Sequence, residues 1–227
     1  MAENPTVKLG VLISGTGSNL QAIIDAILRG DLKAEIRLVI SNRADAPGLE
    51  RARRHGIETG VIEHRQFPSR EDFDHAVLAA LRARSVELVA LAGFMRLLSP
   101  VMLDAFPGSI MNIHNSLLPS FPGIHGPKDA IDYGVKIAGC TVFFVTPGVD
   151  VGPVIVQAAV PVMPGDDEQS LAARILQQEH RIFPHAISLF QQGRLEIHGR
   201  QVIIKGDSST TQSSSPLVNP AVIDSKS

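Results

Sequence analysis

Residues 7–28 read VKLGVLISGTGSNLQAIIDAIL, and this segment predicts the architecture of the chain. Residues 7–14 are mostly apolar, which is typical of a strand buried on both faces of a sheet. Gly15-Thr16-Gly17 allows a sharp turn, and apolar residues then return at helical spacing from Leu20. Ser18 and Gln21 form a capping-box pattern, which predicts the start of a helix. This order predicts the first part of a strand–helix–strand unit.

The same alternation continues to residue 113. Strands are predicted at 35–41, 58–62, 87–92 and 109–113, with helices at 48–55, at 69–84 and from Pro100 onward. The order predicts an α/β fold, with a mostly parallel, twisted sheet and helices on both faces. The carboxyl ends of the strands then meet at one edge, where such folds bind their ligands.

The pattern changes after Ile113. A loop rich in Pro and Gly is expected at 114–127. Strands are predicted at 137–145 and 154–162, followed by a long helix at 170–192 and a hairpin at 195–204, so the C-terminal part is expected to hold antiparallel strands and a long helix. A kink is expected near Pro184. We predict a single domain over 1–205 and a disordered tail at 206–227.

Composition restricts the class of protein. The chain of 227 residues has 21 Lys and Arg against 23 Asp and Glu, a net charge of −2. This balance argues against a dedicated nucleic-acid-binding protein. The sequence has no apolar run long enough to span a membrane. Its single cysteine, Cys140, is expected to be a buried structural thiol and fits a cytoplasmic setting.

The turn at 14–19 suits an anion, because its glycines let a ligand approach and the helix start favours negative charge. A plain tight turn explains the two glycines equally well. Leu20 replaces the third glycine of a dinucleotide fingerprint, although Arg43 could accept a 2′-phosphate, so an NADP enzyme stays an alternative. A single phosphate monoester suits the turn best.

Asn112 and His114 end the fifth predicted strand and, two residues apart, share one side of it. An amide and an imidazole together suit a developing oxyanion, although a histidine at a strand end is more often structural. Asp150 lies in the turn at 146–153, either as a turn residue or as a carboxylate that orients a water or His114 and accepts a proton.

No metal site is predicted, since the histidines lack the spacing of zinc ligands. The acidic residues at 166–168 could attract a cation. A more ordinary explanation is the helix dipole, which favours negative charge before a helix start.

Several longer motifs resemble the phosphoribosylglycinamide formyltransferase (GAR transformylase) family. They are ISGTGSNL at 13–20, LAGFMR at 91–96, NIHNSLLPSFPG at 112–123, VDVGPVI at 149–155 and QEH at 178–180. The resemblance covers about 7–204. It implies a Rossmann-like formyltransferase fold and a cytoplasmic enzyme of de novo purine biosynthesis. The implied reaction transfers the formyl group of 10-formyltetrahydrofolate to the amine of glycinamide ribonucleotide.

The resemblance also implies a role for individual residues. The catalytic set would be Asn112, His114 and Asp150. Glycinamide ribonucleotide would contact Gly15, Thr16, Gly17, Ser18, Asn19 and Glu179. The folate would contact Arg70, Met95, Arg96, Leu97, Leu98, Val145, Thr146, Val149 and Asp150. The phosphate-binding half would span about 1–108 and the folate-binding and catalytic half about 109–205, with no metal and with only small molecules as partners.

Two positions depart from the family pattern. Asn115 stands where the family usually has proline, and Phe143 where a histidine is common. Methionyl-tRNA formyltransferase and formyltetrahydrofolate deformylase share parts of the motifs, so both remain alternatives. Each of these families has a further domain, which counts against them. A phosphate-binding module without turnover is a third alternative. We expect a monomer or a homodimer.

Overall fold

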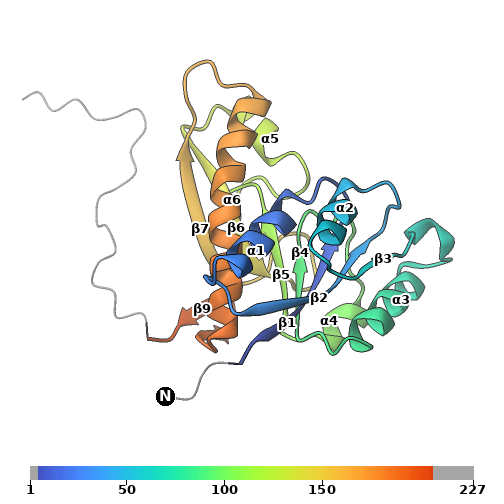
Figure 1. Ribbon diagram of the computed structural model, residues 1–227. Coiled ribbons are helices and arrows are strands. Elements are labelled where there is room, and N and C mark those ends of the chain that lie inside the picture. The colour runs from blue at the N-terminus through green and yellow to red at the C-terminus, as the bar shows by residue number, and fades with distance from the viewer. Residues whose placement is uncertain (1–4, 207–227) are drawn as a thin grey trace, which may run out of the picture.

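The computed structural model describes residues 5–206 (Figure 1). In this part of the chain, seven strands form one sheet in the order β3-β2-β1-β4-β5-β6-β7. The strands are β1 (Val7–Ile13), β2 (Ala34–Ser41), β3 (Thr59–Val61), β4 (Leu88–Leu91), β5 (Ile110–His114), β6 (Ile137–Phe144) and β7 (Val154–Pro161). The strands from β3 to β5 pair in parallel, whereas β6 and β7 are antiparallel. The predicted fold class is therefore confirmed.

Helices cover both faces of this sheet. One face holds α1 (Ser18–Leu28), α2 (Pro47–Arg54), α5 (Gly126–Tyr133) and α6 (Glu168–Gln191), and the other holds α3 (Arg70–Arg82) and α4 (Pro100–Ala105). A short 3₁₀ helix, η1 (His64–Gln66), precedes α3, and the hairpin of β8 (Leu195–His198) and β9 (Gln201–Ile204) follows α6. Both the long helix and the closing hairpin agree with the sequence prediction.

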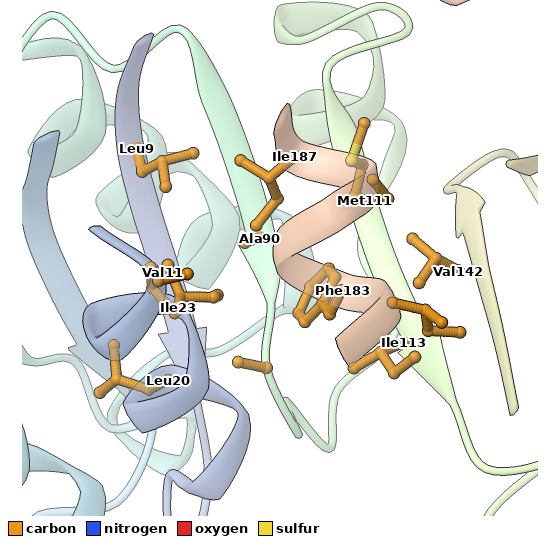
Figure 2. Close-up of a cluster of buried hydrophobic side chains, with 14 of the residues drawn as sticks. Leu9, Val11, Leu20, Ile23, Ala90, Met111, Ile113, Val142, Phe183 and Ile187 are labelled. Atoms are coloured by element: carbon orange, nitrogen blue, oxygen red, sulfur yellow. The ribbon is translucent and has the colours of Figure 1, made fainter. Parts of the chain in front are cut away.

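The core beneath α6 shows why the strands are apolar throughout. Phe183 and Ile187 of α6 lie against Ala90, Met111 and Ile113 of β4 and β5 (Figure 2). Neighbouring strand residues point to opposite faces, so the next residues along these strands enter the second core under α3 and α4. Phe183 is fully buried, and a buried side chain of this size contributes about 1.5–3 kcal/mol. This packing fixes the position of α6 on the sheet.

The capping box predicted at Ser18 and Gln21 is wrong. Helix α1 begins at Ser18, and its N-cap is Gly17, in the left-handed region at φ 71°, with no side-chain cap. The Gln21 side chain instead donates to Asp25 on the same helix. The first backbone N–H groups of α1 are therefore left without a side-chain acceptor.

The loop predicted at 114–127 ends earlier than expected, because α5 begins at Gly126. Pro127 near its start and Gly134 as a left-handed C-cap are signals that could have predicted this helix. Helix α6 starts at a capping box between Asp167 and Ser170 and continues through Pro184 to Gln191. Apart from Gly206, the tail predicted at 206–227 lies outside the described residues.

Candidate active site

The site lies where the order of the strands reverses. Strand β1 pairs with β2 on one side and with β4 on the other, so the segments that follow β1 and β4 separate at the carboxyl edge. Open α/β sheets bind ligands in the crevice at this point. Two cavities of about 850 and 610 Å³ lie here, and both are lined by Asn19, Gly93 and Met95.

The larger cavity surrounds the glycine turn. Every residue from Ser14 to Asn19 lines it, which includes all the residues predicted to contact the phosphate. Ser14 anchors the turn, because its Oγ donates to Asn42 Oδ1 at 2.6 Å and accepts from Met95 N at 2.8 Å. The turn is thereby tied to the end of β2 and to the segment after β4.

Gly17 is the glycine that the turn requires. It has φ 71°, and a Cβ on it would lie 2.7 Å from Gly48 Cα in α2. A Cβ on Gly15 would meet no atom within 4 Å. A side chain at position 17 would therefore strain the backbone and push the turn away from α2.

The smaller cavity brings together the residues predicted for folate and for catalysis. It is lined by Arg70, the segment from Met95 to Leu98, Val145 to Asp150, Asn112, His114 and Glu179, among others. These side chains come from five separate parts of the chain. Their grouping agrees with the prediction, while their individual roles stay predictions.

His114 and Asp150 face each other inside this cavity. Nδ1 of His114 lies 3.7 Å from Oδ2 of Asp150, and their side chains are only 6% and 12% exposed. Nε2 of His114 lies 2.9 Å from the carbonyl oxygen of Phe121, which can only accept, so Nε2 carries a proton. Nδ1 is then the ring nitrogen that can exchange a proton beside the carboxylate.

Asp150 is held in place by the backbone. Its Oδ2 accepts a 2.8 Å hydrogen bond from Gly123 N, and its own φ is 53°, in the left-handed region that few residues other than glycine adopt. Backbone strain of this kind is found most often at functional sites. The loop at 116–125 thus holds both partners, His114 through Phe121 and Asp150 through Gly123.

Asn112 lies in β5 between Leu91 of β4 and Phe143 of β6. Phe143, one of the departures from the family pattern, is buried and lines the smaller cavity beside Asn112. It offers no group that exchanges a proton. Asn115, the other departure, directly follows β5 and lies beside the start of α5, since its backbone and side-chain oxygens would each lie 2.7 Å from a Cβ on Gly126.

Glu179 of α6 is buried beside the start of α1. Its Oε2 accepts a 2.8 Å hydrogen bond from Nδ2 of Asn19, and it lines the smaller cavity. Burial raises the pKa of the Glu179 carboxyl. The hydrogen bond from Asn19 and the charge of His114 lower this pKa, but only in part. Oδ1 of Asn19 is buried and has no hydrogen-bond partner among the described residues.

Sequence analysis did not single out Asn42 as a site residue. Asn42 directly follows β2 and lines the larger cavity, and its Nδ2 lies 3.2 Å from Nδ1 of His64. The signal that could have identified Asn42 is its position, since a polar residue just after a strand lies at the carboxyl edge of the sheet, where ligands bind. Its neighbour Arg43 also lines this cavity, and its guanidinium donates to both carboxylate oxygens of Asp45.

Other groups considered in the sequence have structural partners. Asp166 pairs with Arg174, and Asp167 caps α6. Cys140 is buried, as expected, and burial raises the pKa of its thiol to about 12. Within residues 5–206, no cluster of three or more His, Cys, Asp or Glu side chains is arranged to hold a metal ion. None of the helices described is both long and apolar enough to cross a membrane.

Comparison with known proteins identifies the family. The model of the formyl transferase family matches residues 7–187. The chain belongs to this family. The family member phosphoribosylglycinamide formyltransferase from Escherichia coli (strain K12) is 47% identical over 200 residues, which cover 88% of this chain and 94% of that protein. The resemblance found in the sequence motifs is thereby confirmed.

Structural comparison agrees with this membership. The chain is similar to the solved structure of glycinamide ribonucleotide transformylase 1 from Symbiobacterium toebii, with a TM-score of 0.87 and 55% identity over 88% of this chain and 94% of that one. The trifunctional purine biosynthetic protein adenosine-3 of Drosophila pseudoobscura pseudoobscura is 51% identical over 197 residues, but this chain spans only 14% of its length.

Proposed function

We propose that the chain transfers the formyl group of 10-formyltetrahydrofolate to the amine of glycinamide ribonucleotide, a step of purine biosynthesis. The observation that carries this proposal is the buried His114–Asp150 pair, which lies beside Asn112 in a cavity that adjoins the glycine turn. The names of the relatives support the same activity. Both reactants are small molecules.

The larger cavity suits the phosphate end of the ribonucleotide. The start of α1 has no side-chain cap, so its first N–H groups are free to bind an anion. Glu179 is hydrogen-bonded to Asn19 of the glycine turn. It suits the amine at the opposite end of the ribonucleotide, because a carboxylate attracts an amine. We assign Gly15 to Asn19 and Glu179 to this substrate.

The smaller cavity suits a flat, largely apolar molecule with a polar edge. Leu97, Leu98, Val145 and Val149 provide apolar walls, and backbone groups of the irregular segment at 95–98 can bind the edge of a pterin. Arg70 lines the same cavity and suits an acidic tail. We assign this cavity to the folate.

The chemistry needs an oxyanion donor and a proton acceptor. When the amine attacks the formyl carbon, a C–N bond forms and the carbonyl oxygen becomes negative. Asn112 and the protonated Nδ1 of His114 would donate to this oxygen. Asp150 would accept the proton that leaves the amine. As the bond to N10 of the folate breaks, N10 would take a proton from His114.

The test is formyl transfer by the purified chain. With 10-formyltetrahydrofolate and glycinamide ribonucleotide, we expect tetrahydrofolate and formylated ribonucleotide to form in equal amounts. Water alone and methionyl-tRNA serve as alternative acceptors. Formate release at the same rate without the ribonucleotide would indicate a deformylase, and transfer to the tRNA would indicate a tRNA formyltransferase; either outcome rejects the proposal.

The cellular setting is part of the same proposal. An enzyme of purine biosynthesis with small, polar substrates is expected in the cytoplasm, as a monomer or a homodimer. Sedimentation of the purified chain over a range of concentrations would distinguish the two assembly states.

A further inference from the structure

Asp74 is a fully buried carboxyl that the reaction does not use. It lies on α3, and its Oδ2 accepts a 2.5 Å hydrogen bond from the backbone N–H of Ser99, just before α4. Its Oδ1 is buried and has no hydrogen-bond partner among the described residues, and the same holds for Oγ of Ser99.

Packing alone does not account for this carboxyl. Burial raises the pKa of Asp74, and the proximity of the backbone N–H and the side chain of Ser99, together with the charge of Arg70, lowers it only in part. A buried carboxyl with one unpaired oxygen destabilises a protein, whereas an apolar side chain would fill the same space between α3 and α4 without that cost. The role of Asp74 must therefore be to fix the backbone at Ser99, to which it is hydrogen-bonded.

The bond holds the end of an irregular segment. Residues 95–98 form neither helix nor strand, so no ladder of backbone hydrogen bonds fixes them. At the start of the segment, Met95 N donates to Ser14 Oγ, and directly after its end, Ser99 N donates to Asp74 Oδ2. The peptide bond is planar, so fixing the N–H of Ser99 also fixes the direction of the Leu98 carbonyl.

Every part attached to this anchor lines the smaller cavity. The segment from Met95 to Leu98 forms one wall, and Pro100 of α4 continues it. Arg70 lies one helical turn before Asp74 on α3 and lines the same cavity. Asp74 thus joins α3, α4 and the segment between Met95 and Leu98 into one surface.

We propose that Asp74 is a positioning residue for the folate substrate, acting through the Ser99 N–H to hold the wall formed by residues 95–98. The inference rests on the proposed function, since it takes the smaller cavity as the folate site. Asp74 does not line either cavity, so it is not a catalytic residue.

The test compares Asp74→Ala with Asp74→Asn. The amide of asparagine keeps an oxygen that can accept from Ser99 N, and its NH₂ can donate to Ser99 Oγ. We expect Asp74→Ala to raise the KM for 10-formyltetrahydrofolate and the Kd for tetrahydrofolate, measured by calorimetry, by about 10-fold. The KM for glycinamide ribonucleotide and kcat at saturating folate should change little. Asp74→Asn should restore the folate KM.

Val77→Ala is the matched control. Val77 is a buried residue of the same helix, and its truncation weakens packing without removing the bond to Ser99. It should lower Tm and leave the folate KM unchanged. If Asp74→Ala does not fold, Asp74→Ser gives the same comparison, because its hydroxyl is one bond shorter and does not reach Ser99 N.

The outcomes separate this inference from the proposed function. An unchanged folate KM in Asp74→Ala, an equal rise in Val77→Ala, or no rescue by Asp74→Asn would overturn the role of Asp74. A wild-type chain that neither binds tetrahydrofolate nor transfers formyl groups would instead reject the proposed function.

Discussion

Asn19 donates a 2.8 Å hydrogen bond from Nδ2 to Oε2 of Glu179, although 160 residues separate the two along the chain. The bond joins the start of α1 to the middle of α6, and both side chains are buried. It places a carboxylate at the border between the two cavities, where Asn19 lines both. Helix α6 is thus part of the site as well as part of the core.

Replacing Glu179 should separate stability from activity. Because burial raises its pKa in the folded state, the unfolded state binds fewer protons between the two pKa values, and wild-type stability falls as the pH rises through that window. Glu179→Gln removes this loss, and its amide can donate to the unpaired Oδ1 of Asn19. We expect a Tm at pH 7 higher by about 2–4 °C and turnover at least about 10-fold lower.

Thermal melts between about pH 4 and pH 8 check this prediction, with Asn19→Asp as a comparison that adds a second carboxyl. The Tm values of wild type and Glu179→Gln should converge at the acid end, where the carboxyl is protonated in both states. A wild-type Tm that rises with pH relative to Glu179→Gln would show that the carboxylate stabilises the fold.

Gly17→Ala should damage the glycine turn. The left-handed φ of 71° costs a residue with a Cβ about 1–2 kcal/mol, and the Cβ would also meet Gly48 Cα at 2.7 Å. We expect a lower Tm and a KM for the ribonucleotide at least about 10-fold higher. Gly15→Ala, with no atom within 4 Å of its Cβ, is the control for stability and should keep the wild-type Tm. Equal Tm losses in the two variants would contradict this account.

Asn112 and Asp150 should act on one transition state. Loss of one preorganised donor lowers turnover by about 100- to 1000-fold, and we expect this of Asn112→Ala, with ribonucleotide affinity nearly unchanged. Asp150→Asn tolerates the left-handed φ of 53° and loses only the charge, so it should be impaired as strongly and alter the pH–rate profile.

The double variant Asn112→Ala, Asp150→Asn completes this comparison. It should lose less than the product of the two single losses, because the residues act together. Single-turnover rates across pH provide the measurement, with binding of each substrate determined separately. Strictly multiplicative losses would leave both residues in the site but refute their cooperation.

Tyr133 should influence His114 from outside the cavity. Its ring packs edge-on against Phe121 with centroids 5.8 Å apart, and the Phe121 carbonyl oxygen lies 2.9 Å from His114 Nε2. Removing such a ring pair in Tyr133→Ala should lower kcat by up to about 10-fold. Tyr133→Phe keeps the ring and should retain wild-type kcat. A kcat that falls equally in both variants would implicate the hydroxyl instead.

The same side chain provides a spectroscopic signal. Tyr133 is the only tyrosine of the chain, which has no tryptophan. Its fluorescence therefore reports on the loop at 116–125, and we expect it to change when both substrates occupy the site.

The parallel part of the sheet and the glycine turn at 14–19 were predictable from the sequence, because the periodicity of a buried strand and the glycines of a turn act over a few residues.

Prediction was weaker where a local signal competed with a tertiary contact. The capping box at Ser18 was locally reasonable, but Gly17 takes the N-cap position because the turn packs against Gly48 of α2. The motifs indicated His114 and Asp150 through the resemblance, yet nothing near either residue predicts that Phe121 and Gly123 hold them.

Periodicity and turn chemistry in the linear chain were sufficient for the fold class and the order of most elements, and the resemblance of several motifs indicated the family, since these depend on patterns within each element or motif. The Asn19–Glu179 bond, the Asp74 anchor at Ser99 and the meeting of the two cavities arose only when distant segments packed together. Such contacts depend on the relative placement of helices on the sheet, which is set by the whole core, including Phe183 under α6, and by no single stretch of residues.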